Sequence, residues 1–355
     1  MFLALIAIIL TLILVVGIHE GGHALAASYF QVKIKKVSIG FGKPLLRWQN
    51  SSGCEWVWAI LPLGGYIQLE NTRISPVTSV EYSACFDKKP IWQRILILLA
   101  GSIANFMIAW FALVLVYIIG LNYTLPQIQS VQPKSYAAQE GIIAGDQFVS
   151  IAGHKTPSWN DVGMQLVIYW GTKNVPVMLS RNGGKEFKEV KLDLSQVQFR
   201  GLKTTLLTQL GMEPNLSAPQ SILRFPSIGA AIHQANINIV NMLYFFLMIF
   251  KQLFSGVIPF SMLLGPLSVF VASVASLTQG IVVFMFFIAT LSLAVALVNL
   301  FPVPGLDGGS IVYAMVEKIR GKSVSIAMEL LLHRLVFIVF CVLLVHLLMN
   351  DLRRI

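Results

Sequence analysis

Two histidines and a glutamate lie in the segment His19-Glu20-Gly21-Gly22-His23, which directly follows an unbroken apolar stretch. On a helix, imidazoles four positions apart project from one face, about 6 Å apart along the axis. That spacing suits a single Zn²⁺ ion, with Glu20 beside it to take a proton from metal-bound water. Polar and charged groups are costly in lipid, so we expect this cluster to have a function.

Asp307 is the candidate for a third metal ligand, because zinc hydrolases use three protein ligands and leave one position open for water. It ends a late apolar stretch, in the run Asn299-Leu300-Phe301-Pro302-Val303-Pro304-Gly305-Leu306-Asp307-Gly308-Gly309. The two prolines prevent a regular helix. Irregular backbone at membrane depth is tolerated where it is buried in protein or lines a wet cavity. The following glycine pair would let the backbone approach a ligand or the metal closely.

The composition indicates that a multi-pass membrane protein positions these residues. Of 355 residues, 56% are hydrophobic and only 12% are charged, about half the charged fraction of an ordinary globular domain. Four apolar stretches can cross a hydrocarbon core of about 30 Å with their flanks: Phe2–Ile18, Ile95–Leu121, Ile281–Phe301 and Leu335–Leu348. A fifth, Ile237–Phe254, carries polar residues and is ambiguous.

The net charge of +10 fits membrane topology and anionic lipid better than nucleic acid, which we exclude as a partner. Basic residues cluster between the first two spans and between the last two: Lys33, Lys35, Lys36, Lys43, Arg47, Lys88, Lys89 and Arg94, then Lys318, Arg320 and Lys322. Such clusters mark the cytoplasmic side. Both termini and residues 122–227 are then outside, and the metal site lies toward the cytoplasmic leaflet.

The number of membrane crossings, odd or even, constrains the ambiguous fifth stretch. If Ile237–Phe254 crossed the membrane once, the cluster around Lys318 would lie outside, against the charge pattern. We therefore interpret this stretch as an interfacial or re-entrant helix, or one packed beside the bundle. Proline and glycine in residues 255–266 separate it from the next span.

Residues 127–214 are more polar, and residues 137–148 resemble the signature of a PDZ domain. Phe148–Ile151, Val175–Leu179 and Phe187–Leu192 are predicted strands, the last two on either side of a glycine turn. Pro157–Tyr169 is a predicted helix with Ser158 as its N-cap. The domain is therefore expected to be of the α+β type.

Together these motifs resemble the site-2 protease family of intramembrane zinc metalloproteases, peptidase family M50, and within it the bacterial RseP-like branch. The likeness rests on residues 19–23 and 299–308, and it extends to residues 38–42, 61–66, 101–106, 264–266 and 350–352. It thus covers nearly the whole chain. The chain departs from the pattern at Ser102, where the family often has proline, and it has room for one PDZ domain where the RseP pattern has two.

The resemblance implies a multi-pass α-helical membrane protein with about four transmembrane helices, a membrane-associated β-hairpin region and one α+β PDZ domain. Residues 1–121 would form the N-terminal membrane part, with the histidine helix, the β-region and the second span. Residues 122–215 would form an extracytoplasmic PDZ domain. Residues 216–279 would form a linker with interfacial or brace helices, and residues 280–355 the C-terminal pair of spans with the Asp307 motif.

The implied activity is zinc-dependent hydrolysis of peptide bonds in transmembrane segments, with one Zn²⁺ per chain on His19, His23 and Asp307, and with Glu20 as the base. The resemblance implies that Asn299 contacts the substrate backbone, and Pro304 lies in the same motif. Asn105 either assists at the substrate or makes an interhelical hydrogen bond. The segment Gly64-Gly65-Tyr66 either captures unwound substrate at a strand edge or is a tight turn.

The implied location is a bacterial cytoplasmic (inner) membrane. Substrates would be single-span proteins already cut by a site-1 protease, such as an anti-sigma factor, or remnant signal peptides. In the PDZ domain, Leu210-Gly211-Met212 falls where a carboxylate-binding loop would lie. The domain either binds peptide there or filters substrates by size, and the second interpretation is favoured. The rival functions are an intramembrane metal-transport protein and an inactive PDZ-bearing membrane scaffold.

Overall fold

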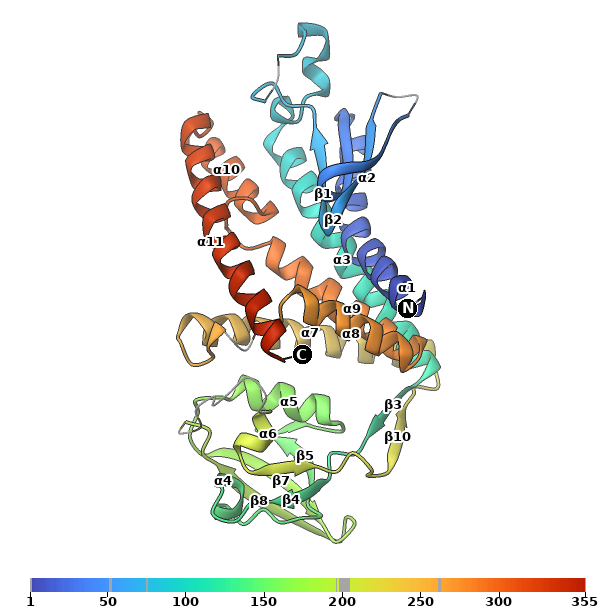
Figure 1. Ribbon diagram of the computed structural model, residues 1–355, viewed down its shortest axis with the longest axis vertical. Helices are drawn as coiled ribbons and strands as arrows, with labels where there is room; N and C mark the ends of the chain where they lie inside the picture. Colours follow the sequence, from blue (N-terminus) through green and yellow to red (C-terminus); the bar gives the residue numbers. More distant parts are fainter. Residues whose placement is uncertain are drawn as a thin grey trace. The chain divides into compact units, whose positions relative to one another are not determined.

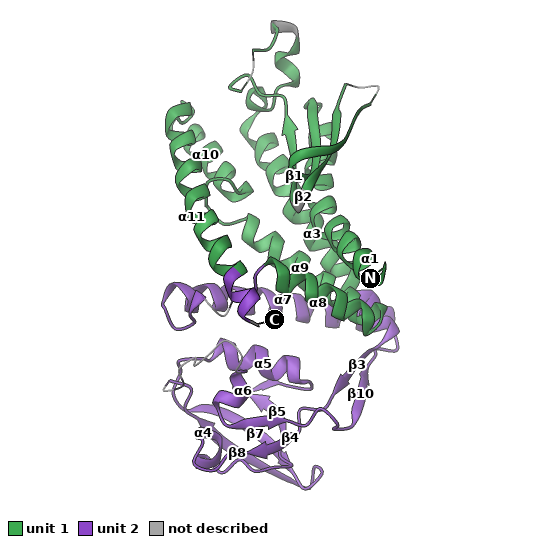
Figure 2. Cartoon of the chain, in the orientation of Figure 1, with its two compact units in different colours: residues 1–113, 266–348 green, residues 114–265, 349–355 purple. Residues whose placement is uncertain are grey.

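The computed structural model describes residues 2–50, 53–74, 76–195, 197, 205–260 and 263–354. The chain forms two compact units (Figure 2), unit 1 of Met1–Leu113 and Pro266–Leu348, and unit 2 of Val114–Gly265 and Met349–Ile355. Unit 1 contains His19, Glu20, His23 and Asp307, and unit 2 contains the PDZ-like segment. The domain boundaries expected from the sequence remain predictions.

Helices dominate unit 1 (Figure 1). They are α1 (Phe2–Thr11), the π-helical segment η1 (Leu12–Gly17), α2 (Ile18–Tyr29), α3 (Ile91–Ile119), α8 (Pro266–Thr278), α9 (Ile281–Asn299), α10 (Asp307–Arg320) and α11 (Ile326–Arg354). Among the described residues, five helices are long and apolar enough to cross a membrane: Phe2–Tyr29, Ile91–Ile119, Ile228–Phe254, Ile281–Asn299 and Ile326–Arg353. The multi-pass helical class is confirmed. The ambiguous stretch qualifies by length and composition, and its orientation to the membrane remains a prediction.

Apolar packing joins the N-terminal helix to α8 and α9. Ala7, Val15, Phe284 and Ile288 form a buried cluster at this joint. Close to it, the hydroxyl oxygens of Thr11 and Ser273 lie 2.8 Å apart, so two buried polar groups satisfy each other. This joint fixes the span that carries His19 and His23.

The predicted β-hairpin consists of β1 (Ile34–Gln49) and β2 (Glu55–Leu69). Both strands bend, so residues 34–39 pair with residues 65–69 on one side and with residues 55–58 on the other. Gly40 and Gly42 adopt φ values of 92° and 90° at the bend in β1, a conformation that favours glycine. Within the described chain, residues 65–69 pair along one side only and form an edge of this sheet.

The far end of the hairpin displays exposed apolar side chains, Leu45, Leu46, Trp48 and Ile60. The rings of Trp48 and Trp56 stack with centroids 6.0 Å apart. Exposed aromatic and aliphatic side chains next to basic residues are typical of a membrane interface. A connecting segment with the short helices η2 (Ser79–Ala84) and η3 (Phe86–Lys88) then leads to α3.

Unit 2 contains a four-stranded sheet of order β6-β5-β7-β8 and two strand pairs, β4 with β9 and β3 with β10. Its elements are β3 (Leu121–Thr124), β4 (Ile128–Val131), α4 (Tyr136–Gln139), β5 (Gln147–Ile151), β6 (His154–Lys155), α5 (Trp159–Ile168), β7 (Val175–Arg181), β8 (Glu186–Leu192), α6 (Leu206–Gln209), β9 (Met212–Pro214), β10 (Gln220–Leu223) and α7 (Ile228–Phe254). The predicted strands and the helix α5 are present, and Ser158 caps α5 in a capping box with Asp161.

Within unit 2, α7 is attached to the PDZ-like fold by a buried amide. The Gln252 side chain donates hydrogen bonds to the carbonyl oxygens of Val167 at 2.6 Å and Ile168 at 3.0 Å. These carbonyls lie in the last turn of α5, where carbonyl oxygens have no amide donor one turn further along the helix. The end of α7 therefore serves as an external C-cap for α5.

Candidate active site

Two glycines set the spacing between the helices that carry the histidines. A Cβ on Gly22 would lie 2.4 Å from the carbonyl oxygen of Ala100, so α2 and α3 pack backbone to backbone at this point. A Cβ on Gly101 would lie 2.3 Å from Nε2 of His23 and 2.8 Å from Cε1 of His19. The two imidazoles therefore occupy the space that a side chain at position 101 would need.

A hydrogen bond to α3 orients the imidazole ring of His23, and a second side chain of α3 approaches His19. Nδ1 of His23 lies 2.7 Å from the carbonyl oxygen of Ile97. A carbonyl only accepts, so this nitrogen carries the proton and Nε2 is free to ligate a metal. Nδ1 of His19 lies 3.5 Å from the amide of Asn105, which is fully buried. Asn105 thus contacts a histidine, in line with the interhelical alternative.

Asp307 is placed by a tight return of the chain after α9. Residues 300–306 form an irregular connection, and α10 begins at Asp307. A Cβ on Gly308 would lie 2.3 Å from the carbonyl oxygen of Leu300, and one on Gly309 would lie 2.2 Å from that of Val303. The glycine pair was expected to admit a ligand or metal, and its close contacts are instead with the chain's own backbone. They fold the start of α10 against the connection.

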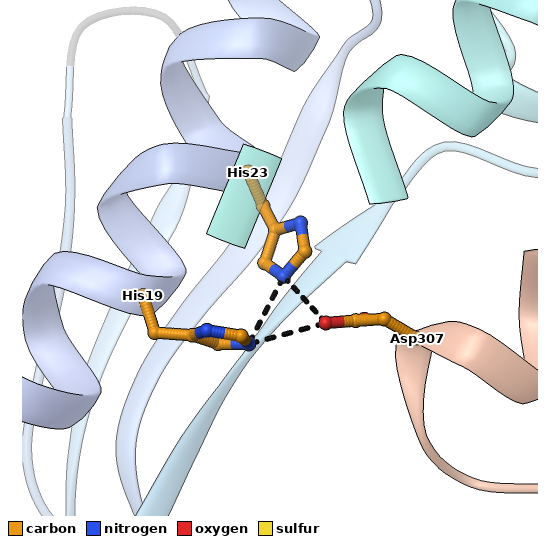
Figure 3. A group of neighbouring side chains, drawn as sticks. All are labelled: His19, His23 and Asp307. Atoms are coloured by element: carbon orange, nitrogen blue, oxygen red, sulfur yellow. Dashed lines mark hydrogen bonds and ion pairs between the residues drawn. The ribbon is translucent and has the colours of Figure 1, made fainter. Parts of the chain in front are cut away.

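Three ligating atoms converge at one point (Figure 3). Oδ2 of Asp307 lies 3.2 Å from Nε2 of both His19 and His23, and these two nitrogens are 3.3 Å apart. Tetrahedral zinc with bonds of about 2.0–2.1 Å requires ligand separations of about 3.3 Å. Among the described residues, no hydrogen-bond donor satisfies the buried Oδ2 atom. The donor set and its spacing therefore fit one Zn²⁺ ion.

Glu20 lies between this site and the β-sheet. The backbone amide of Ile67, on the edge segment of β2, is a hydrogen-bond partner of its carboxylate. A Cβ on Gly65 would lie 3.5 Å from Cγ of Glu20 and 3.3 Å from Cγ1 of Val16. Gly65 therefore lets the strand edge approach the carboxylate closely.

The other predicted substrate-binding residues are Asn299, Pro304, Gly64 and Tyr66. Asn299 is the last residue of α9 and is half-buried. Pro304 lies in the connection that Gly309 contacts, and Gly64 and Tyr66 flank Gly65 on β2. His154, His233, His333 and His346 lie outside the one group of metal-binding residues found in the described chain.

The loop Leu210-Gly211-Met212 belongs to unit 2. The backbone amides of Leu210 and Gly211 donate to the carbonyl oxygens of Leu206 and Thr208 at 3.2 and 3.0 Å. A loop that binds a carboxylate must offer free amides, and these two are already used. These two amides are therefore not available to a peptide carboxylate, and the role of the loop remains a prediction.

The packing roles of Gly22 and Gly101, and the role of Ile97 as hydrogen-bond acceptor from His23, were not predicted from the sequence. The available signal was the occurrence of small residues in apolar spans, which often marks helix–helix contacts. That signal does not say which helix is the partner. The contacts became visible only when α2 and α3 were placed side by side.

Comparison with known proteins supports the geometry. The chain matches the model of peptidase family M50 over residues 7–344. It is 27% identical to protease RseP of Yersinia pestis over 444 aligned positions, which cover 99% of this chain and 98% of that protein. It is 26% identical to the regulator of sigma-E protease RseP of Escherichia coli (strain K12) over 442 positions, with the same coverage. A putative zinc metalloprotease of Vibrio cholerae is 35% identical over 210 positions, which cover 59% of this chain and 46% of that protein.

The RseP alignments extend over more positions than the 355 residues of this chain, so those relatives contain sequence that this chain lacks. The family match nevertheless includes both parts of the metal site, the paired histidines and the late aspartate. The chain therefore belongs to peptidase family M50, and it is a zinc metalloprotease similar to RseP over nearly its whole length.

Proposed function

We propose that this protease cleaves transmembrane segments of single-span membrane proteins after another protease has removed their outer domain. The observation that supports this most directly is the position of the metal ligands. His19 and His23 lie within the candidate span Phe2–Tyr29, and Asp307 follows the candidate span Ile281–Asn299. A metal site built from such segments is reached by substrates that are themselves in the membrane.

The chemistry divides between the metal and the side chains around it. Bound zinc would lower the pKa of its water toward about 7 and polarise the scissile carbonyl. Glu20 would take the proton from that water and later deliver it to the leaving amine. His23 presents Nε2 because the carbonyl oxygen of Ile97 in α3 accepts from its Nδ1–H, and Nε2 of His19 lies 3.3 Å from that atom. Asn299 is proposed to bind the substrate backbone, while the contact of Asn105 with His19 favours an orienting role for that amide.

Substrate capture is proposed to occur at the edge of β2. A transmembrane segment hides its peptide bonds in helical hydrogen bonds. Local unwinding frees backbone groups, which an edge strand can pair by β-addition. Residues 65–69 form such an edge, and Gly65 lies against Glu20. Gly64, Gly65 and Tyr66 would therefore align the unwound peptide with the base.

The PDZ domain is proposed to act as a size filter. The amides of Leu210 and Gly211, in its candidate carboxylate-binding loop, are already hydrogen bonded within the domain. An intact outer domain on a substrate would then be excluded by bulk. Two substrates with one transmembrane segment and outer domains of different size test this idea. We expect at least about 10-fold faster cleavage of the smaller one, and equal rates would contradict the filter.

The names of the relatives guide the choice of substrate. The Escherichia coli relative is a regulator of sigma-E protease, and we propose an anti-sigma-factor-type substrate or remnant signal peptides here. The proposed setting is a bacterial cytoplasmic membrane, with both termini and the PDZ domain outside and the metal site toward the cytoplasmic leaflet. In this topology α7 is an interfacial or re-entrant helix.

The decisive experiment replaces Glu20 with glutamine. Purified Glu20→Gln should keep one zinc per chain, because His19, His23 and Asp307 are unchanged. Its cleavage of a model transmembrane substrate should fall by at least about 10²-fold, because loss of a general base alone lowers the rate by about 10²–10⁴. Retained cleavage by this variant would remove Glu20 as the base, and metal flux through the parent protein in vesicles would favour the transport alternative.

A further inference from the structure

Asp307 begins a helix that apolar packing holds only weakly. In α10 the buried residues are Gly308, Gly309 and Ala314, and the most apolar window of α11 contains no buried residue. We refer to residues 307–348 as the α10–α11 hairpin. The rings of Tyr313 and His333 lie 6.0 Å apart, so its two helices contact each other (Figure 1). Another kind of contact must fix the hairpin relative to α2 and α3.

The first such contact is an ion pair between α3 and α10. Nη1 of Arg94 donates to Oε1 of Glu317 at 3.0 Å. The Arg94 side chain is only 9% exposed, and its guanidinium lies 5.4 Å from the ring centroid of Phe86. A buried, stacked guanidinium has little freedom, so it holds its partner in a defined direction. Glu317 thus ties α10 to the helix whose Ile97 carbonyl orients His23.

The second contact joins the segment before α3 to the first turn of α11. Nη2 of Arg73 lies 2.9 Å from Oε2 of Glu329 and donates to the carbonyl oxygen of Val324 at 2.6 Å. Local turns preorganise this arginine. Its amide donates to the side chain of Asn71 at 2.9 Å, and the neighbouring Thr72 donates to Asp87 through its amide and hydroxyl.

The Asp87 carboxylate is itself held in its charged form. Partial burial acts to raise the pKa of Asp87, but the hydrogen bonds from Thr72 outweigh it and lower the pKa below its usual value. The Asp87 carboxylate therefore accepts both hydrogen bonds from Thr72, the residue next to Arg73. Both arginines belong to the N-terminal part of unit 1, and both partners belong to the α10–α11 hairpin.

We propose that Arg94 and Arg73 form a two-point clamp that positions Asp307 for metal binding. Glu317 lies about 15 Å along α10 from Asp307, at 1.5 Å per residue. A tilt of the helix would therefore displace the Asp307 carboxylate, whereas zinc sites tolerate deviations of only about 0.2 Å. The clamp acts through the helix, so both arginines are positioning residues.

The test measures zinc affinity, together with the thermal unfolding of the metal-free protein. We expect Arg94→Gln and Glu317→Gln each to weaken zinc binding about 10-fold, at the lower end of losses seen when groups that support metal ligands are removed. The double variant should lose no more than either single variant, because the same pair is broken. Arg73→Gln should weaken zinc binding less, about 3-fold, because the ion pair of Arg73 is more exposed.

Two further variants separate positioning from folding. Exchanging the charges, Arg94→Glu with Glu317→Arg, should recover part of the lost affinity. The matched control is Arg47→Gln, which breaks an ion pair of 3.1 Å to Glu55 within the β-hairpin and should leave zinc affinity unchanged. A folded Arg94→Gln protein with the parent's zinc affinity would overturn the clamp. So would additive losses in the double variant.

If Arg94→Gln does not fold, Glu317→Gln decides the matter, because that side chain is 25% exposed and its loss leaves less buried charge. Unchanged affinity in folded Glu317→Gln would then contradict the proposal. The clamp concerns the positioning of a zinc ligand and does not depend on the identity of the substrate. A parent protein that binds zinc but cleaves no transmembrane segment would contradict the proposed function and leave the clamp intact.

Discussion

The metal site has two parts that are built in different ways. The histidine part is closely packed, because Gly22 contacts the backbone of Ala100 and Gly101 lies against the rings of both histidines. The aspartate part enters from an irregular connection, and the Asp307 side chain remains 19% exposed. Close packing fixes the first part, whereas backbone turns and ion pairs fix the second.

This difference teaches how one site can be both precise and accessible. Packed interiors resist displacement, and even small volume changes are felt there. Helix α10 has few buried side chains and depends on polar contacts at its far end. We therefore expect substitutions in the histidine part to abolish metal binding, and equivalent substitutions in the aspartate part to weaken it.

Among the glycine substitutions, the largest expected effect follows from Gly101→Ala. The new methyl group would lie 2.3 Å from Nε2 of His23 and 2.7 Å from Cε1, so the ligands must move. We expect loss of stoichiometric zinc and a fall in cleavage of at least about 100-fold, as for other displacements of about 1 Å in active sites. Metal analysis of the purified variant checks the first outcome, and a variant with full zinc and normal activity would contradict the packing account.

A neighbouring pair of glycines gives a sharper comparison within the same motif. In Gly22→Ala the methyl group would lie 2.4 Å from the carbonyl oxygen of Ala100, whereas in Gly21→Ala nothing lies within 4 Å. We expect Gly22→Ala to lower zinc affinity and cleavage by about 10- to 100-fold and Gly21→Ala to retain zinc binding. Parallel zinc titrations of the two purified variants measure this difference in affinity. Equal zinc affinities would show that the α2–α3 contact does not set the ligand positions.

The smallest expected effect concerns the aspartate part. A methyl group in Gly309→Ala would lie 2.2 Å from the carbonyl oxygen of Val303, so the start of α10 must shift. Residues 300–306 lack regular structure and can absorb part of the strain. We expect zinc affinity to fall about 10-fold, with one zinc per chain retained at high zinc concentration. Gly163→Ala in α5, with nothing within 4 Å, is the control.

An outcome for Gly309→Ala as severe as that for Gly101→Ala would end the distinction between the two parts. It would show that the connection after α9 is as rigid as the packed helices. The same zinc titration, run on all three glycine variants, makes the comparison direct.

Local patterns predicted the parts of the molecule that depend on short-range physics. The helical spacing of His19 and His23 placed both imidazoles on one face. Ser158 predicted the start of α5. The π-helical segment η1 had no such signal, because its residues are uniformly apolar and any helical register suits them.

Long-range contacts could not be predicted in the same way. Arg94 was interpreted only as part of a cytoplasmic basic cluster, and its partner Glu317 lies far along the chain. Charge counting indicates the membrane side of a loop and does not say which acid meets which base. The glycine contacts at Gly308 and Gly309 likewise required the path of residues 300–306.

The sequence by itself determined the chemistry, because ligand types and helical periodicity are local properties: a zinc pair on one helix, a glutamate beside it and a late aspartate. Tertiary structure decided whether these groups meet. Only the packing of α2 on α3, and the arginine contacts to the α10–α11 hairpin, bring Oδ2 of Asp307 to 3.2 Å from both Nε2 atoms. Such convergence depends on contacts between segments distant in the chain, which no local pattern encodes.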